Sequence, residues 1–137
     1  MSLENFFNPH SVAIVGASHQ KGKVGYEILK NMIDAGYEGR IFPINPNRQA
    51  IEGLKCYPDL KSVGQVPDMV IIIVPAKVVP AIMEQGAEVG AQSVVIITAG
   101  FKEVGNEGRE LEKQIIQLAR QAGIRIIGPN CLGLIVP

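Results

Sequence analysis

The chain has 137 residues, and its 13 basic and 13 acidic side chains give a formal net charge of zero. Hydrophobic residues make up 47% of the chain but aromatic residues only 5%, so the apolar content is aliphatic, as in a parallel sheet covered by helices. The balanced charge, with no long run of either sign, excludes the basic surface that nucleic acids and anionic membranes require. A chain of this length is expected to form one domain, residues 1–137, with residues 1–10 as a lead-in.

Neither a membrane span nor a metal site is expected. The longest apolar run, residues 69–74, is far too short to cross a bilayer. Cys56 and Cys131 form no C-x-x-C pair and have no metal-ligand spacing, so both are interpreted as reduced thiols. Since no secretory signal is apparent, a cytoplasmic protein is the expectation.

A glycine-rich loop follows the first predicted strand. The strand covers residues 11–15, the loop contains Gly16, Gly22 and Gly25, and a helical pattern runs from Val24 to a stop at Ala35 and Gly36. Such a turn leaves backbone N–H groups unpaired at the positive end of the helix dipole. The loop therefore predicts a phosphate site, interpreted as the seat of the diphosphate of a nucleotide-type cofactor.

A second strand is predicted over residues 40–45. Pro43 has no N–H for a ladder hydrogen bond, which places this strand near an edge or makes it irregular. Residues 45–48 form a turn, and residues 49–67 show no long period, although Tyr57 and Pro58 open one short predicted helix.

Strands and helices alternate through the rest of the chain. Strands are predicted over 68–74, 93–98 and 124–127; one helix begins near Val79, with Pro80 in its first turn, and another ends at Gly123. This alternation indicates an α/β fold: a Rossmann-like, doubly wound, five-stranded, mainly parallel sheet with helices on both faces. The expected strand order is 3-2-1-4-5, which gathers the loops after strands one, two and four around one crevice.

The residues around that crevice favour a ribose phosphate over a free ribose hydroxyl. The G-x-G-x-x-G fingerprint fails after Gly16, and no carboxylate ends the second strand. Arg48 at that end suits a phosphate, although it is equally well read as a surface charge, and Lys21 or Lys23 could supply the charge instead. Coenzyme A and NADP both fit, whereas NAD is disfavoured.

Five short motifs follow one another along the chain. They are V-G-A-S at 15–18, N-P-N at 45–47, V-P-A at 74–76, T-A-G-F at 98–101 and G-P-N-C-L-G at 128–133. In this order they resemble the N-terminal CoA-binding domain of NDP-forming acyl-CoA synthetases, the family of ADP-forming acetyl-CoA synthetases and of the succinyl-CoA synthetase alpha subunit. The last motif together with A-G-F is specific to this family, whereas the glycine turn alone would be weak evidence for the resemblance.

The resemblance implies that coenzyme A lies along the strand tips. Its diphosphate would lie at the glycine turn, with Ser18 or Gln20 donating, and its thiol would be steered toward Asn130. A side chain at Gly16 or Gly25 is expected to obstruct that approach. The expected cofactor-binding residues are Gly16, Ser18, Gln20, Gly22, Gly25, Asn47, Arg48, Pro75, Ala76, Thr98, Ala99, Gly100 and Asn130.

The resemblance also implies that a phosphohistidine carries the phosphoryl group to an acyl-phosphate intermediate. His10 and His19 match no such motif, so no catalytic residue is assigned and the chain is expected to be one module of an acid–thiol ligase. Its expected partners are CoA or acyl-CoA, the remaining ligase domains or an ATP-grasp-type subunit, and another copy of itself. Two alternatives stay open: an NADP-binding oxidoreductase or redox-regulator domain, and a free-standing CoA sensor.

Overall fold

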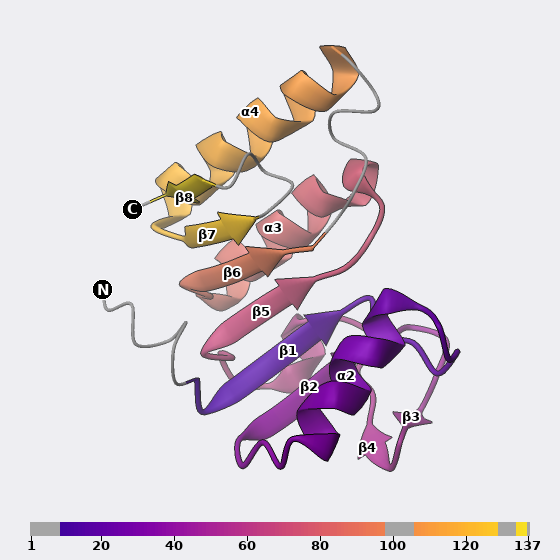
Figure 1. Ribbon diagram of the computed structural model, residues 1–137. Helices are drawn as coiled ribbons and strands as arrows, with labels where there is room; N and C mark the ends of the chain where they lie inside the picture. The colour runs from indigo at the N-terminus through magenta and orange to yellow at the C-terminus, as the bar shows by residue number, and fades with distance from the viewer. Residues whose placement is uncertain (1–8, 98–105, 129–133, 137) are drawn as a thin grey trace.

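The computed structural model describes residues 9–97, 106–128 and 134–136, so most of the expected lead-in lies outside it. One six-stranded sheet has the order β2-β1-β5-β6-β7-β8 (Figure 1). Five strands run parallel: β1 (Ser11–Val15), β2 (Arg40–Ile44), β5 (Met69–Ile72), β6 (Ser93–Ile96) and β7 (Arg125–Gly128). The sixth, β8 (Leu134–Val136), is antiparallel to β7.

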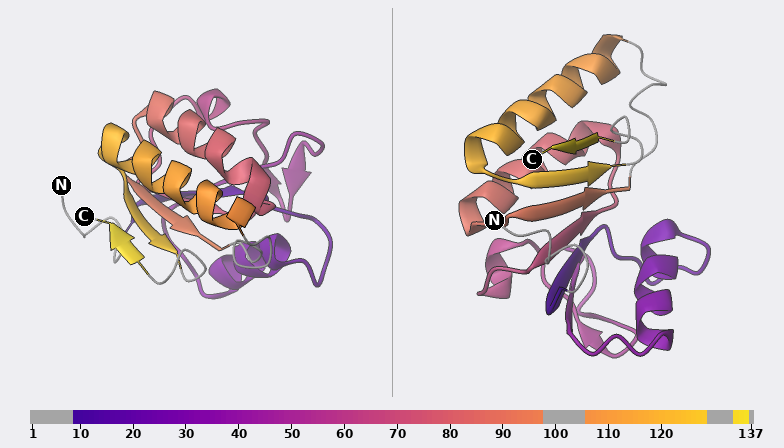
Figure 2. Two further views of the ribbon diagram at one scale, coloured as in Figure 1. Left: turned by 90° about the horizontal axis from the view of Figure 1, so that it is seen from above. Right: turned by 60° about the vertical axis from the view of Figure 1, so that its left-hand side comes forward.

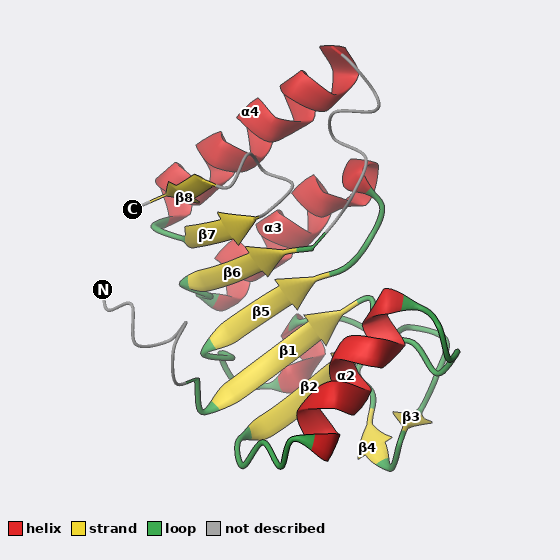
Figure 3. Ribbon diagram, viewed as in Figure 1, coloured by secondary structure: helices red, strands yellow, loops and turns green. Residues whose placement is uncertain are grey.

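Helices cover both faces of the sheet, as Figures 2 and 3 show. Helix α2 (Val24–Asp34) lies on one face, and α3 (Val79–Val89) and α4 (Asn106–Ala122) lie on the other. Because side chains alternate along a strand, β1 contributes to both cores. Ile14 packs with Leu29 of α2, whereas Val15 packs with Met83 of α3 and Ile115 of α4.

Short elements join β2 to β5 in place of a long helix. A hairpin of β3 (Ala50–Ile51) and β4 (Leu54–Lys55) precedes the 3₁₀ turn η1 (Lys61–Val63). A second 3₁₀ turn, η2 (Ala76–Val78), leads into α3. The short helix predicted after Tyr57 is therefore a single 3₁₀ turn, and the hairpin and β8 have no counterpart in the sequence prediction.

The predicted end of α2 is confirmed. Gly36 adopts a positive φ of 76°, and its N–H donates to Ile33 O at 3.0 Å. Tyr37 N then donates to Met32 O at 3.1 Å, which satisfies the last carbonyls of the helix. The fold class is likewise confirmed, with helices on both faces of a mainly parallel sheet.

The predicted strand order is wrong. Counted along the chain, the five parallel strands lie in the order 2-1-3-4-5, because β5 inserts between β1 and β6. All four residues of β5 are buried, and such a strand requires neighbours on both edges, whereas Pro43 fits β2 for the edge. The winding of the sheet therefore reverses between β1 and β5, and the loop after strand three, not strand four, lies beside the glycine loop.

Candidate functional site

The glycine loop begins at a tight junction of three strands. Ile73 N donates to Val15 O at 2.7 Å, and Gly16 N donates to Ile44 O at 3.3 Å. Gly16 has a φ of 97°, and a Cβ at this position would overlap the carbonyl oxygen of Ile73. Glycine is thus required here so that β1 and β5 can converge.

The start of α2 packs directly on this junction. A Cβ on Gly25 would overlap the carbonyl oxygen of Gly16. The sequence interpretation gave a different reason for glycine at 16 and 25, namely that a side chain would obstruct a ligand. In the structure, a side chain at either position would first collide with the protein's own backbone, and ligand approach at these two positions stays a prediction.

Side chains of the loop and of α2 hold the segment between these glycines. Ser18 Oγ accepts a hydrogen bond from Gln20 N at 3.0 Å, and Gly22 N donates to Glu27 Oε2 at 3.2 Å. Gly22 has a φ of 91° with open space around its α-carbon. Sequence reasoning missed Glu27, although an acidic residue in the first turn of a helix is a common partner for free N–H groups.

Backbone donors at the start of α2 are available for an anion. Lys23 occupies the N-cap position and no side chain caps the helix. Within the described ranges, the N–H groups of Val24 and Gly25 donate to no other residue. This is the arrangement of donors that binds phosphate at helix N-termini.

The tip of β2 is fastened to the glycine loop by Asn45. Its side-chain amide donates to Ala17 O at 2.9 Å, while its Oδ1 accepts from Asn47 N at 2.7 Å. These bonds bring the exposed residues Asn47 and Arg48 to the side of the loop. Asn45 lies within the N-P-N motif, so the motif located it, but the sequence did not reveal its positioning role.

The loop after β5 is the third segment at this edge. Pro75 is exposed, whereas the side chain of Ala76 is buried at 8% exposure and packs in the core on the α3 side. Two large apolar side chains beside these loops are unusually exposed, Val24 at 52% and Val78 at 42%. They offer apolar contacts that the sequence interpretation did not consider.

The structure thus brings together nine of the thirteen predicted ligand residues. Four lie in the glycine loop, Gly25 lies in the first turn of α2, two residues follow β2 and two follow β5. Thr98, Ala99, Gly100 and Asn130 lie outside the described residues. Of the two histidines in the sequence, His10 precedes β1 at the opposite end of the sheet, and His19 lies in the glycine loop.

Several positive and polar side chains at the loop have no hydrogen-bond or ion-pair partner among the described residues. Those of Gln20, Lys21, Lys23 and Arg48 make no hydrogen bond or ion pair with any described residue. Arg48 lies near Cys56: burial raises the pKa of the Cys56 thiol, and the Arg48 charge offsets part of that rise. Arg48 therefore adds a positive charge on the β2 side of the loop.

Neither a metal centre nor a membrane span is present in the described ranges. No group of three or more His, Cys, Asp or Glu side chains there is placed to hold a metal ion. None of the helices in those ranges combines the length and the apolar character that a membrane span requires.

Comparison with known proteins decides the family. Residues 10–137 match the family described as CoA binding domain. The chain belongs to this family. This CoA-binding domain is 51% identical over 126 residues to an ADP-forming acetate–CoA ligase of Methanocaldococcus jannaschii, covering 92% of the chain but 17% of that ligase.

Two further relatives agree. The alpha subunit of ADP-forming acetate–CoA ligase I of Pyrococcus furiosus is 48% identical over 140 residues, which cover 98% of this chain and 30% of the subunit. The dinucleotide forming acetyl-coenzyme A synthetase 1 of Ca. Korarchaeum cryptofilum, solved in the apo form, superposes with a TM-score of 0.87 at 42% identity, over 94% of this chain and 28% of that one. The chain therefore spans less than a third of each of these proteins.

Proposed function

We propose that this CoA-binding domain holds coenzyme A for acyl transfer within an ADP-forming acyl-CoA ligase. The observation that carries the proposal is the uncapped start of α2 at the point where the winding of the sheet reverses, surrounded by uncommitted donors and cations. Parallel sheets bind their ligands at that point, and a diphosphate matches a bare helix start. The family match over residues 10–137 supports coenzyme A as the ligand.

In the proposed complex, each loop takes one part of the ligand. The diphosphate accepts hydrogen bonds from the helix start and from Ser18 or Gln20, and the 3′-phosphate pairs with Arg48. Pro75 lies along the nucleotide, with the backbone of Ala76 beside it. The pantetheine arm then runs toward residues 98–100 and Asn130, which are outside the described ranges.

In the proposed reaction, this domain and the other ligase domains have separate roles. The thiolate of coenzyme A attacks an acyl phosphate, the new bond is the thioester, and phosphate leaves. In an earlier step, the carboxylate of the acid would take the phosphoryl group from a phosphohistidine of another domain, which forms the acyl phosphate and releases the histidine. His10 lies at the far end of the sheet, and neither His10 nor His19 matches a phosphohistidine motif. Within this scheme the domain positions the thiol of coenzyme A, because a bound thiol reacts at a far higher effective concentration than a free one.

The lack of a carboxylate at the tip of β2 argues against NAD as the ligand, whereas the alternative of an NADP-binding domain stays open. Asn45 and Asn47 occupy the tip of β2, where dinucleotide enzymes carry a carboxylate. NADP is harder to separate from coenzyme A by charge alone, since both carry a ribose phosphate. The distinction therefore requires a direct titration.

Calorimetric titration of the 137-residue chain with CoA, dephospho-CoA, NADPH and NADH tests the proposal. CoA is expected to bind, dephospho-CoA to bind about tenfold more weakly because it lacks the phosphate that pairs with Arg48, and the two nicotinamide dinucleotides not to bind. Arg48→Ala should weaken CoA and leave dephospho-CoA unchanged, while Arg120→Ala on α4 is the matched control. Binding of NADPH without CoA would overturn the proposal in favour of an oxidoreductase domain.

A further inference from the structure

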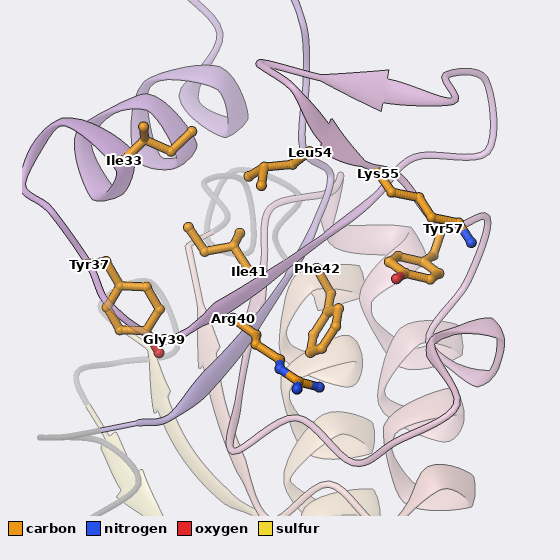
Figure 4. Close-up of a pocket in the computed structure, with 9 residues that line it drawn as sticks. All are labelled: Ile33, Tyr37, Gly39, Arg40, Ile41, Phe42, Leu54, Lys55 and Tyr57. Carbon is orange, nitrogen blue, oxygen red and sulfur yellow. The ribbon is translucent and has the colours of Figure 1, made fainter.

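The outer edge of β2 carries a groove that is separate from the proposed coenzyme A site. It encloses about 420 Å³ and runs from the end of α2 across β2 to β4 (Figure 4). None of the thirteen predicted ligand residues lines it. Its centre is the amino-terminal half of β2, away from the strand tip that faces the glycine loop.

The backbone of β2 is only partly paired along this edge. Alternate residues bond inward to β1: Arg40 N donates to His10 O at 3.0 Å, and Ile44 O accepts from Gly16 N. The residues between them face outward, and Tyr57 covers the carboxyl half by donating to Pro43 O at 2.9 Å and accepting from Asn45 N at 2.9 Å. Within the described chain, the N–H and C=O of Ile41 have no such backbone partner.

Side chains of different character line the two sides of this open edge. On the α2 side, Ile41 packs with Ile33 and Leu54 in the apolar cluster around Leu29. On the opposite side, the rings of Phe42 and Tyr57 meet edge to face, with centroids 5.7 Å apart and planes at 74°. Figure 4 shows these two groups on either side of the strand.

Two cations lie on the aromatic side. Lys55 Nζ is 5.2 Å from the centroid of the Tyr57 ring, and Arg40 Nη1 donates to the neutral Gln65 Oε1 at 3.2 Å. Neither side chain forms an ion pair with a carboxylate of the described residues. The groove thus combines an open strand edge, one apolar wall and one cationic, aromatic wall.

A second copy of the chain does not fit this edge. Among the described residues, the outward-facing backbone of this edge is unpaired only around residues 39–41, because Pro43 lacks an N–H and its carbonyl is already bonded to Tyr57. Antiparallel pairing of two such short stretches would centre on Arg40 and set the two guanidinium groups opposite each other. Like charges directly opposite are destabilising in a sheet.

We propose that this groove binds an extended, acidic segment of a separate polypeptide, which adds a strand beside β2. The backbone of the segment bonds to the N–H and C=O of Ile41, as in other cases of strand addition. Its side chains alternate, so an apolar residue packs against Ile41 and Leu54 while the flanking carboxylates face Arg40 and Lys55. This site is independent of the coenzyme A site.

The probe for this proposal is a short fluorescent peptide that alternates Glu and Val, with a Lys–Val peptide of equal length as control. Anisotropy is expected to show at least about tenfold tighter binding of the acidic peptide, and Arg40→Glu or Lys55→Glu to remove that preference. Lys113→Glu on α4 is the matched charge control. Excess CoA and Arg48→Ala should leave peptide binding unchanged.

A second peptide tests the backbone pairing without altering the protein. Methylating the central amide nitrogens of the acidic peptide removes its N–H donors, and binding is then expected to be lost. The Ile41 amide resonance should shift when the unmethylated peptide is added. Equal binding of acidic and basic peptides, retention of binding by the methylated peptide, no binding of the acidic peptide, or a peptide-free dimer abolished by Arg40→Glu would each overturn the proposal.

Discussion

At the scale of single residues, Glu27 has an unexpected place in the glycine loop. Its carboxylate accepts from Gly22 N at 3.2 Å and so occupies one of the donors that a diphosphate would use. Lys21 and Lys23, which flank Gly22, are uncommitted and balance this negative charge. In the proposed complex, the diphosphate would therefore replace the Glu27 carboxylate at Gly22 N, and this exchange of one anion for another would limit the net gain in free energy.

Tyr37 provides a residue-scale prediction for the dependence of stability on pH. Its hydroxyl donates to Pro9 O at 2.6 Å, and burial, reinforced by the Asp68 carboxylate, raises the pKa of Tyr37 above 10.0. The stability that Tyr37 contributes is thus complete below pH 10 and is lost as the pH rises through its higher folded-state pKa. The free energy of unfolding should fall in alkaline solution.

Chemical denaturation between pH 8 and pH 11 of the original chain and of Tyr37→Phe measures this effect. At pH 8 the variant is expected to be less stable by about 1 kcal/mol, because it lacks the hydrogen bond to Pro9. The two curves should converge above pH 10, although both will decline, since burial also raises the pKa values of Tyr26 and Cys56. Curves that stay parallel throughout would contradict the assignment.

At the scale of elements, two glycines near the start of α2 are required for different reasons. Gly25 faces the carbonyl oxygen of Gly16, whereas Gly22 has open space and only an unusual φ. Gly22→Ala is therefore expected to cost about 1 kcal/mol of stability, from backbone strain alone. Gly25→Ala should cost more than about 3 kcal/mol, because backbone has to move.

Thermal unfolding of the two variants compares these costs within one loop. The expected midpoint is clearly lower for Gly25→Ala than for Gly22→Ala. Equal midpoints would mean that the start of α2 shifts easily. The close approach of helix and strand would then contribute little to stability. A folded Gly25→Ala protein would also show by titration whether the position matters to coenzyme A directly.

Element boundaries were largely predictable because their signals are local. Gly36 ends α2 as expected, and Pro80 lies in the first turn of α3. The predicted order of strands was wrong, because the order depends on which strand needs two neighbours. Two features carried that information: Pro43, which favours an edge, and the apolar run of β5, which is buried on both faces.

The candidate site was predictable to a similar degree. The motifs located the three loops that meet at this edge of the sheet, since motif residues are contiguous in the sequence, and ligand binding there stays a prediction. Asn45 was not assigned a role because it bonds to Ala17, 28 residues earlier, which the sequence does not place beside it. Glu27 was missed for a different reason: its position in the first turn of α2 is a local signal that the interpretation did not use. The groove at the outer edge of β2 has no signature in the sequence, because its walls come from three separate elements, α2, β2 and β4.

At the scale of the whole molecule, the sheet has a stable centre and one unprotected side. The amides of β5 bond alternately to β1 and β6, and its side chains are buried on both faces. In β2, by contrast, only every second amide is bonded inward to β1, and Ile41 lies at the open edge. Stability should therefore decrease from β5 toward β2.

Native-state hydrogen exchange provides the test of this gradient. The Ile41 amide is expected to exchange at least roughly a hundredfold faster than its neighbour Phe42, which faces β1, and the β5 amides should exchange only by global unfolding. Fast exchange in β5 would mean that it is an edge strand, as the sequence-based order required. Slow exchange at Ile41 in the free protein would mean that the edge is already covered, and an added acidic strand would then have nothing to pair with.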